Sequence, residues 1–157
     1  MSTTDLTDEE RREASVAQAT AYLQLLQAQD WDKWIELWGQ DAVLEFPYAP
    51  RGRPRTYRGR EEILRYMSGT TESIAVDGVT ALRLHSLQDP NTVIAELEIQ
   101  GHLLANNEPY NQIYVTVFEF KDGRIEHYRE YWNPLVSIDA HGGYDQWIAA
   151  FEDRAGR

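Results

Sequence analysis

The chain has 157 residues, of which 42% are hydrophobic, and this fits a single domain over residues 1–157 with a sizeable core. It contains no cysteine, which excludes a disulfide framework, a thiolate nucleophile and a cysteine-based zinc site. The net charge of −11 opposes nucleic-acid binding, because a polyanion would be repelled over most of the surface. The first residues lack a signal-peptide pattern and no apolar run is long enough to span a membrane, so we expect a cytoplasmic protein.

The N-terminal half predicts three helices. After a flexible segment 1–7, Thr7 and Glu10 have capping-box spacing, and the apolar positions that follow predict a helix over 8–28. A shorter helix is expected to begin after Asp30 and to end at Gly39, with apolar residues spaced i, i+3, i+4 and i+7: Trp31, Trp34, Ile35 and Trp38. Tryptophans at this spacing belong more often to a core than to a ligand site, although an indole that lines a pocket does both.

A strand at 43–46 and a Pro/Arg-rich loop over 47–58 precede the third helix, expected at 60–67. Five arginines fall within residues 51–60 of this otherwise acidic chain. They form either a solvated loop that balances the acidic surface or an electrostatic gate that attracts a carboxylate-bearing substrate.

From residue 74 the pattern becomes that of β-strands. Four β-rich runs, separated by short turn signals, cover residues 74–87, 92–104, 110–120 and 124–132. Short connections force neighbouring strands to be antiparallel, so the fold class is α+β: helices first, then a curved antiparallel sheet, and finally an extension over 134–157 with a helix near 144–151. Residues 112–120 are apolar on both faces. Three helices can cover only one face of the sheet, so we expect a homodimer through the other.

Glu130 is the strongest candidate for chemistry. The period of two places it between Tyr128 and Trp132 on one face of the last strand. Desolvation there would raise the pKa of the carboxyl group towards neutrality and make it a usable general acid or base. The alternative is a structural role, in which the carboxylate pairs with an arginine or accepts a hydrogen bond from a buried tyrosine.

The strand over 92–104 carries a second polar row. Glu96, Glu98, Gln100 and His102 share one face, which is either solvated or, if it is concave, part of a pocket. A metal is not expected, since a lone histidine on a strand is more often exposed or hydrogen-bonded than a ligand. The sequence has no nucleophile elbow, phosphate-binding loop or dinucleotide fingerprint, so we expect no cofactor.

The order of helices and strands, together with residues 30–46 and the hairpin 118–125, resembles the nuclear transport factor 2-like superfamily. Within it the chain is similar to SnoaL-like polyketide cyclases and ketosteroid isomerases, and more closely to phenazine-biosynthesis A/B proteins, through Asp89–Asn91, Tyr110–Asn111 and Tyr128–Pro134. The resemblance covers most of residues 10–137 and implies a cone that binds small molecules. It also implies an acid–base role for Glu130, because the matching glutamate of those proteins helps to condense two amino-ketone molecules.

One departure from that family bears on both substrate and reaction. The family pairs this glutamate with a histidine just after the third helix, whereas residues 68–82 contain none.

The leading functional hypothesis is a cofactor-independent enzyme of small-molecule (secondary-metabolite) biosynthesis: an isomerase, cyclase, dehydratase or condensation catalyst. Glu130 would move a proton next to the carbonyl group of a hydrophobic or aromatic substrate, and Tyr114 and Tyr128 would donate to the oxyanion. The residues expected to bind the substrate are Trp34, Trp38, Phe46, Tyr48, His102, Phe118 and Trp132.

Two other functions stay open. One is a noncatalytic protein that binds a small molecule. The other is a pure interaction protein with its cone filled by its own side chains, which a cavity below about 300 Å³ would favour.

Overall fold

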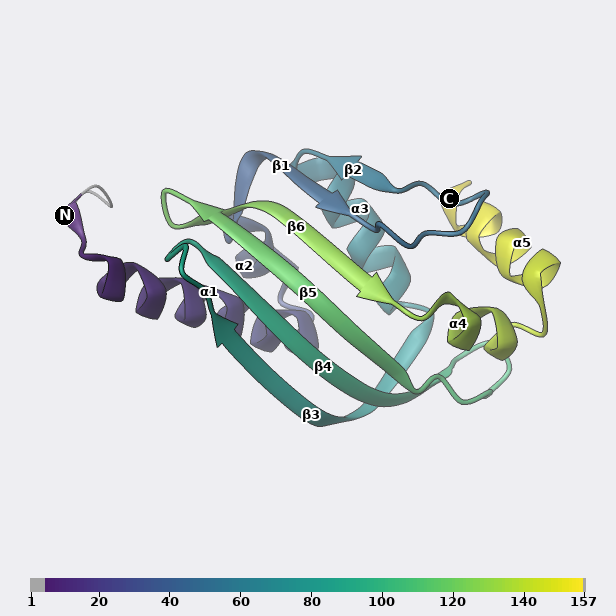
Figure 1. The fold of residues 1–157 in the computed structure, drawn as a ribbon. Coiled ribbons are helices and arrows are strands. Elements are labelled where there is room, and N and C mark those ends of the chain that lie inside the picture. The colour runs from purple at the N-terminus through teal and green to yellow at the C-terminus, as the bar shows by residue number, and fades with distance from the viewer. Residues whose placement is uncertain (1–4, 157) are drawn as a thin grey trace.

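The computed structural model describes residues 5–156. Figure 1 shows a curved sheet with helices behind it and two further helices at one end. The elements in chain order are α1 (Asp8–Ala28), α2 (Trp31–Glu36), β1 (Trp38–Glu45), β2 (Thr56–Arg58), α3 (Arg60–Thr71), β3 (Ile74–Ser86), β4 (Thr92–Leu103), β5 (Gln112–Lys121), β6 (Arg124–Trp132), α4 (Pro134–Ala140) and α5 (Tyr144–Ala155). No helix within residues 5–156 has both the length and the apolar character needed to cross a membrane.

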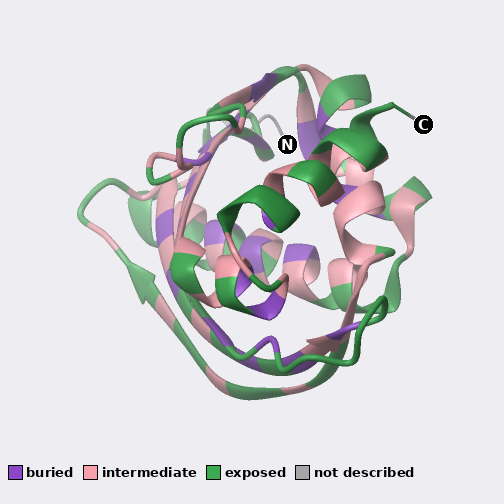
Figure 2. Cartoon of the chain, turned by 90° about the vertical axis from the view of Figure 1, so that its right-hand side faces the viewer, coloured by how far each residue is buried: buried purple, intermediate pink, exposed green. Residues whose placement is uncertain are grey.

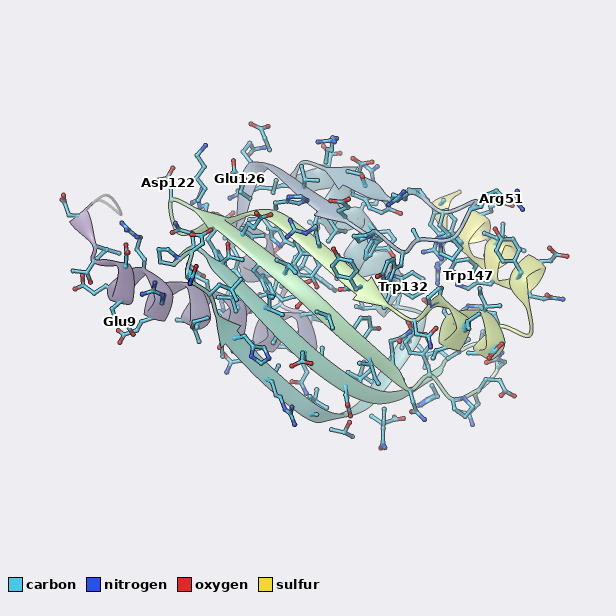
Figure 3. The ribbon with its side chains drawn as sticks, in the orientation of Figure 1. Glu9, Arg51, Asp122, Glu126, Trp132 and Trp147 are labelled. Atoms are coloured by element: carbon cyan, nitrogen blue, oxygen red, sulfur yellow. The ribbon has the colours of Figure 1, made fainter. Side chains whose placement is uncertain are left out.

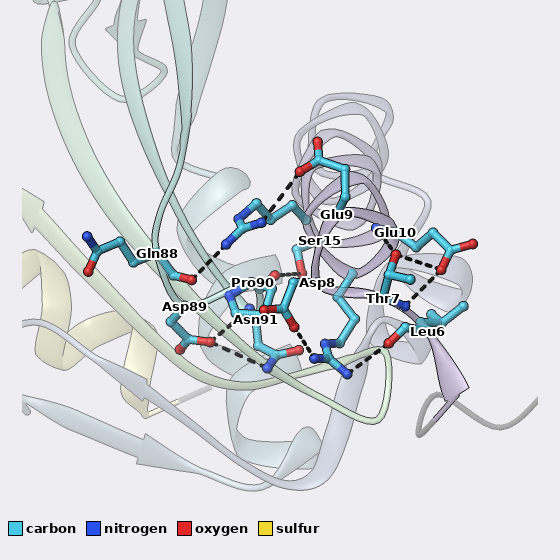
Figure 4. A network of polar contacts seen from close by, with 12 residues as sticks. Leu6, Thr7, Asp8, Glu9, Glu10, Ser15, Gln88, Asp89, Pro90 and Asn91 are labelled. Atoms are coloured by element: carbon cyan, nitrogen blue, oxygen red, sulfur yellow. Dashed lines mark hydrogen bonds and ion pairs between the residues drawn. The ribbon is translucent and has the colours of Figure 1, made fainter.

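Helix α1 has the predicted bounds, and the predicted capping box is present. Thr7 Oγ1 accepts from the backbone N–H of Glu10 at 3.2 Å, and the Glu10 carboxylate accepts from the N–H of Thr7 at 2.8 Å. Of the segment 1–7 expected to be flexible, residues 1–4 lie outside the described residues. Arg12 and Ser15 then tie α1 to the β3–β4 loop through backbone carbonyls of residues 87, 88 and 90. Figure 4 shows Ser15 of α1 beside Gln88 and Pro90 of this loop.

The sheet has six strands in the order β2-β1-β6-β5-β4-β3. The four predicted strands pair as antiparallel neighbours, but β1 runs parallel to β6. The sheet is therefore mixed, which corrects the expectation of a purely antiparallel one. A parallel pair needs a long connection, and the whole of residues 46–123 separates these two strands. Strand β2, in the segment predicted as a loop, pairs with β1.

The second helix is shorter than predicted. It ends before Leu37, and Trp38 and Gly39 belong to β1. The Leu37 carbonyl accepts from the N–H of Ile125 at 2.8 Å, and the Trp38 carbonyl accepts from the Arg60 guanidinium at 2.8 and 2.6 Å. These partners lie far away in sequence, so helical spacing alone could not locate the end of the helix.

The core fills the concave side of the sheet. Figure 2 shows the sheet curving around the helices, with buried residues on the surfaces that face each other. Tyr22 of α1 packs against Trp34, Trp38, Phe118 and Tyr128, with ring centroids 5.1 to 6.1 Å apart. This aromatic cluster excludes water from one side of β6.

The C-terminal segment forms two helices, of which only α5 was predicted. Asn133 caps α4 by accepting from the N–H of Leu135, and Pro134 takes the first helical position, so the pair Asn133-Pro134 is a local signal for this helix start. Trp147 of α5 is buried and donates to Ser137 Oγ of α4 at 2.9 Å. Figure 3 shows Trp147 beside Trp132, where β6 ends, so the helix pair covers this end of the sheet.

Candidate acid–base site

Strand pairing places Glu130 on the inner face of the sheet. It lies opposite Thr116 of β5, which in turn lies opposite Ala95 of β4, and both of these partners are buried. Tyr128 and Trp132 share this face through the period of two. The carboxylate predicted to lie between two aromatic residues therefore points towards the interior.

Burial makes the carboxyl group of Glu130 a weaker acid than an ordinary glutamate side chain. It raises the pKa of the carboxyl group from 4.5 to about 7, even though a hydrogen bond from Tyr128 acts in the opposite direction. That bond joins Tyr128 Oη to Glu130 Oε2 at 2.6 Å. No ion pair within residues 5–156 involves Glu130. Of the two structural roles considered from the sequence, the tyrosine hydrogen bond is present and the arginine pair is not.

A cavity of about 60 Å³ adjoins the carboxylate. Glu130 is half-buried, and it lines this cavity. Trp132 and Trp147 form part of the wall, and the tyrosines Tyr66, Tyr110 and Tyr114 form another part. Pockets that bind organic ligands usually have a volume of about 300–1,000 Å³. In this conformation the cavity therefore has room only for a very small molecule.

A larger hollow of about 540 Å³ lies elsewhere, between α1 and the β5–β6 turn. Leu6, Gln18 and Phe120 are among its lining residues, and Glu130 is not. The smaller cavity is the candidate acid–base site, because a carboxyl group with a pKa near neutrality and a set of tyrosine hydroxyl groups meet there.

The tyrosines of the cavity are neutral hydrogen-bond donors. Tyr110 Oη and Tyr114 Oη lie 3.4 Å apart. Burial is the main cause that raises the pKa of both phenols, well above 10 for Tyr114, so they keep their protons at neutral pH. A neutral phenol next to a carboxylate of pKa about 7 can stabilise a developing oxyanion.

Two guanidinium groups also reach the cavity. Arg53, from the loop before β2, lies over the rings of Trp147 and Phe151, 4.7 and 4.0 Å from their centroids. Arg154 of α5 donates to Ser73 Oγ at 2.8 Å. The nearby His141 has its pKa lowered, mainly by burial, so its imidazole is neutral at pH 7. Within residues 5–156 no three His, Cys, Asp or Glu side chains gather as a metal site would require.

The structure places some of the predicted site residues at the cavity and others in the core. Glu130, Tyr114 and Trp132 line the cavity, while Tyr128 touches the carboxylate. Phe46 lies just behind the wall, 5.2 Å from the Tyr66 ring and 6.5 Å from the Trp132 ring. The core contains the other buried aromatic residues predicted to bind substrate, which do not line this cavity: Trp34, Trp38 and Phe118.

His102 and Tyr48 lie away from the cavity. His102 has the parity of Glu96 and Glu98, opposite to that of the buried Ala95, so it is on the outer face, where its Nδ1 lies 3.0 Å from Asp77. The polar row of β4 is therefore the solvated face, not the pocket. Tyr48 is 64% exposed and packs on Tyr131, whose side chain has the parity opposite to that of Glu130.

Sequence reasoning missed several residues of the cavity wall. Tyr110 belonged to a segment that carried the family resemblance, and Arg53 to the arginine-rich run, so both had a signal. Tyr66, Trp147 and Arg154 had none, because only the packing of α3 and α5 brings them to β6.

Residues 19–128 match the SnoaL-like domain family, and the match ends two residues before Glu130. YesE of Bacillus subtilis, a protein without an assigned function, is 45% identical over 114 residues, which are 73% of this chain and 78% of YesE. A PhzA/B-like protein of Pseudomonas aeruginosa is 35% identical over 123 residues, covering 78% of this chain and 86% of that protein.

Solved structures extend the comparison. A Bacillus subtilis protein provisionally named an isomerase has a TM-score of 0.79 at 37% identity, and the similarity covers 88% of this chain and 98% of that one. A phenazine biosynthesis-related protein from Pseudomonas aeruginosa has a TM-score of 0.71 at 18% identity, covering 87% and 90% of the two chains. The second likeness concerns the fold alone.

Proposed function

The chain belongs to the SnoaL-like family within the nuclear transport factor 2-like superfamily, and from this premise we propose that it is a cofactor-independent acid–base enzyme of isomerase or cyclase type. The observation that carries the proposal is Glu130, a carboxyl group of pKa about 7 beside an internal cavity. The isomerase name of one relative supports this class of reaction. The phenazine-biosynthesis name of another supports a role in small-molecule biosynthesis.

In the proposed reaction Glu130 removes a proton from a carbon next to a carbonyl group and returns it at a second position. A pKa of about 7 suits a group that must both accept and release a proton at neutral pH. Tyr110 and Tyr114 donate hydrogen bonds to the enolate oxygen as charge develops there. One such group contributes about 10²- to 10⁴-fold in rate, so the reaction is an intrinsically easy one that mainly needs positioning.

The role of Tyr128 differs from the one expected from the sequence. Its hydroxyl group already donates to Glu130 Oε2, so it orients the carboxylate and does not serve the substrate oxygen. We assign proton transfer to the other carboxylate oxygen, Oε1.

Substrate binding requires the cavity to open. Helix α5 makes its main backbone contacts with α4, and it joins the remainder of the chain through side chains such as Trp147 and Arg154. Displacement of this helix pair would enlarge the cavity without breaking the sheet. The small volume is also the observation that favours the competing function, an interaction protein with a filled cone.

The test is hydrogen exchange at carbon. Wild-type protein is incubated in D₂O with a panel of small cyclic and aromatic ketones, and deuterium uptake next to the carbonyl group is followed by NMR. We expect uptake with at least one ketone, a loss of about 10²- to 10⁴-fold in Glu130→Gln, and no loss in the control Glu98→Gln, which alters an exposed carboxylate on the outer face.

Full exchange activity in a folded Glu130→Gln protein would refute the proposal. Ligand binding without exchange in either protein would identify a noncatalytic binding protein. The absence of both binding and exchange would favour the filled cone.

A further inference from the structure

The two arginines at the cavity form no ion pair with any of the residues that the structure describes, 5–156. The ion pairs within residues 5–156 include neither Arg53 nor Arg154, whereas Arg60, Arg65 and Arg129 each contact a glutamate. Arg53 donates only a long hydrogen bond of 3.4 Å to Tyr66 Oη, and its Nε is buried without a partner. Arg154 contacts the neutral hydroxyl group of Ser73.

The surroundings make two unpaired cations costly. Aromatic rings cover Arg53, and burial followed by repulsion from Arg53 lowers the pKa of Arg154. A buried charge without a partner loses hydration that nothing replaces. A guanidinium group presents a planar fork of N–H donors, which suits bidentate binding of a carboxylate.

The net charge of the residues that line the cavity indicates the charge of the ligand that would bind there. Its tyrosines and His141 are neutral at pH 7, the two arginines contribute two positive charges, and an ionised Glu130 contributes one negative charge. In the state that accepts a proton, with Glu130 ionised, one positive charge is left over, which a monoanion neutralises and a dianion exceeds.

We propose that the substrate of this acid–base site carries a carboxylate group, which Arg53 and Arg154 bind between them while Glu130 acts on the carbon framework. This inference rests on the proposed function. Arg53 comes from the loop before β2 and Arg154 from α5, so a shared anion joins the two segments and holds α5 closed over the substrate. The carboxylate thereby both selects the substrate and excludes water during proton transfer.

Binding is tested by calorimetry with benzoate and with its neutral isostere benzamide. We expect the wild-type protein to bind benzoate at least 10-fold more tightly than benzamide, with an affinity that falls as salt rises. Arg53→Gln and Arg154→Gln should each weaken benzoate binding at least 10-fold and leave benzamide binding unchanged. Arg154→Lys should recover part of the loss, because it restores the charge without the planar fork.

The control is Arg58→Gln, which changes an exposed arginine at the end of β2 that does not line the cavity. This variant should bind benzoate as the wild type does. Circular dichroism establishes that each variant is folded. Equal affinity for benzoate and benzamide, or benzoate binding that survives both arginine changes, would overturn the carboxylate assignment. Tighter binding of phenyl phosphate than of benzoate would overturn it in favour of a dianion.

The outcome is separable from that of the acid–base proposal. Glu130→Gln should still bind benzoate while losing deuterium exchange. Arginine-dependent carboxylate binding without any exchange would refute only the catalytic role, and exchange that is indifferent to a substrate carboxylate would refute only the arginine site.

Discussion

Replacement of Glu130 by glutamine should stabilise the protein at high pH and much less at low pH. The folded state raises the pKa of this carboxyl group from 4.5 to about 7. Below pH 4.5 the group is protonated in the folded and unfolded chains, so it imposes no ionisation cost. As the pH rises towards 7 the unfolded chain ionises first, and stability is lost progressively until the folded group ionises as well.

The size of the effect follows from the two pKa values. A pKa difference of about 2.5, from 4.5 to about 7, corresponds to about 3 kcal/mol of stability lost above pH 7. This is an upper value, because the side chain of Glu130 is only partly removed from solvent. At about 2–4 °C per kcal/mol for a chain of this size, the Gln variant should gain up to about 6–12 °C in Tm relative to the wild type between pH 5 and pH 8.

The assay is thermal unfolding of both proteins at pH 5, 6, 7 and 8 at fixed ionic strength. The quantity of interest is the difference in Tm between variant and wild type, since other acidic groups titrate alike in both. Glu98→Gln on the outer face serves as the matched control and should show a difference that does not change with pH. A Glu130→Gln difference that is the same at pH 5 and pH 8 would refute the idea of a buried carboxyl group with a raised pKa.

Three further outcomes are expected. Tyr128→Phe removes the hydrogen bond that lowers the Glu130 pKa, so the midpoint of the pH–rate profile should move to higher pH, and an unmoved midpoint would contradict this. Ser137→Ala leaves the buried indole N–H of Trp147 without its hydrogen-bond acceptor, at a cost of about 1–3 kcal/mol. The backbone amides of α5 should therefore exchange with solvent about 10-fold faster or more, and unchanged exchange rates would contradict a stabilising role of this hydrogen bond. We expect a homodimer through the apolar outer face of β5, where Ile113 is 59% exposed, and Val117→Lys should convert it to a monomer in light scattering; a monomeric wild type would remove this expectation.

The sequence by itself determined the features that depend on neighbouring residues. The cap at Thr7 and the bounds of α1 follow from hydrogen bonds between residues three or four apart. The grouping of Tyr128, Glu130 and Trp132 on one face follows from the period of a strand, which needs no knowledge of the remainder of the chain. Turn residues likewise fixed the four antiparallel strands to within two residues at their ends.

Only the tertiary structure decided which face of the sheet is the inner one. The alternation of apolar and polar residues in β4 is compatible with His102 either in a pocket or in solvent. The helices cover the face of Ala95, so His102 lies on the opposite, outer face. The parallel pairing of β1 with β6 and the meeting of Arg53 with Arg154 are decided in the same way. These contacts join segments distant along the chain, and no local pattern encodes them, because their geometry depends on how the sheet curves and where the last helix docks.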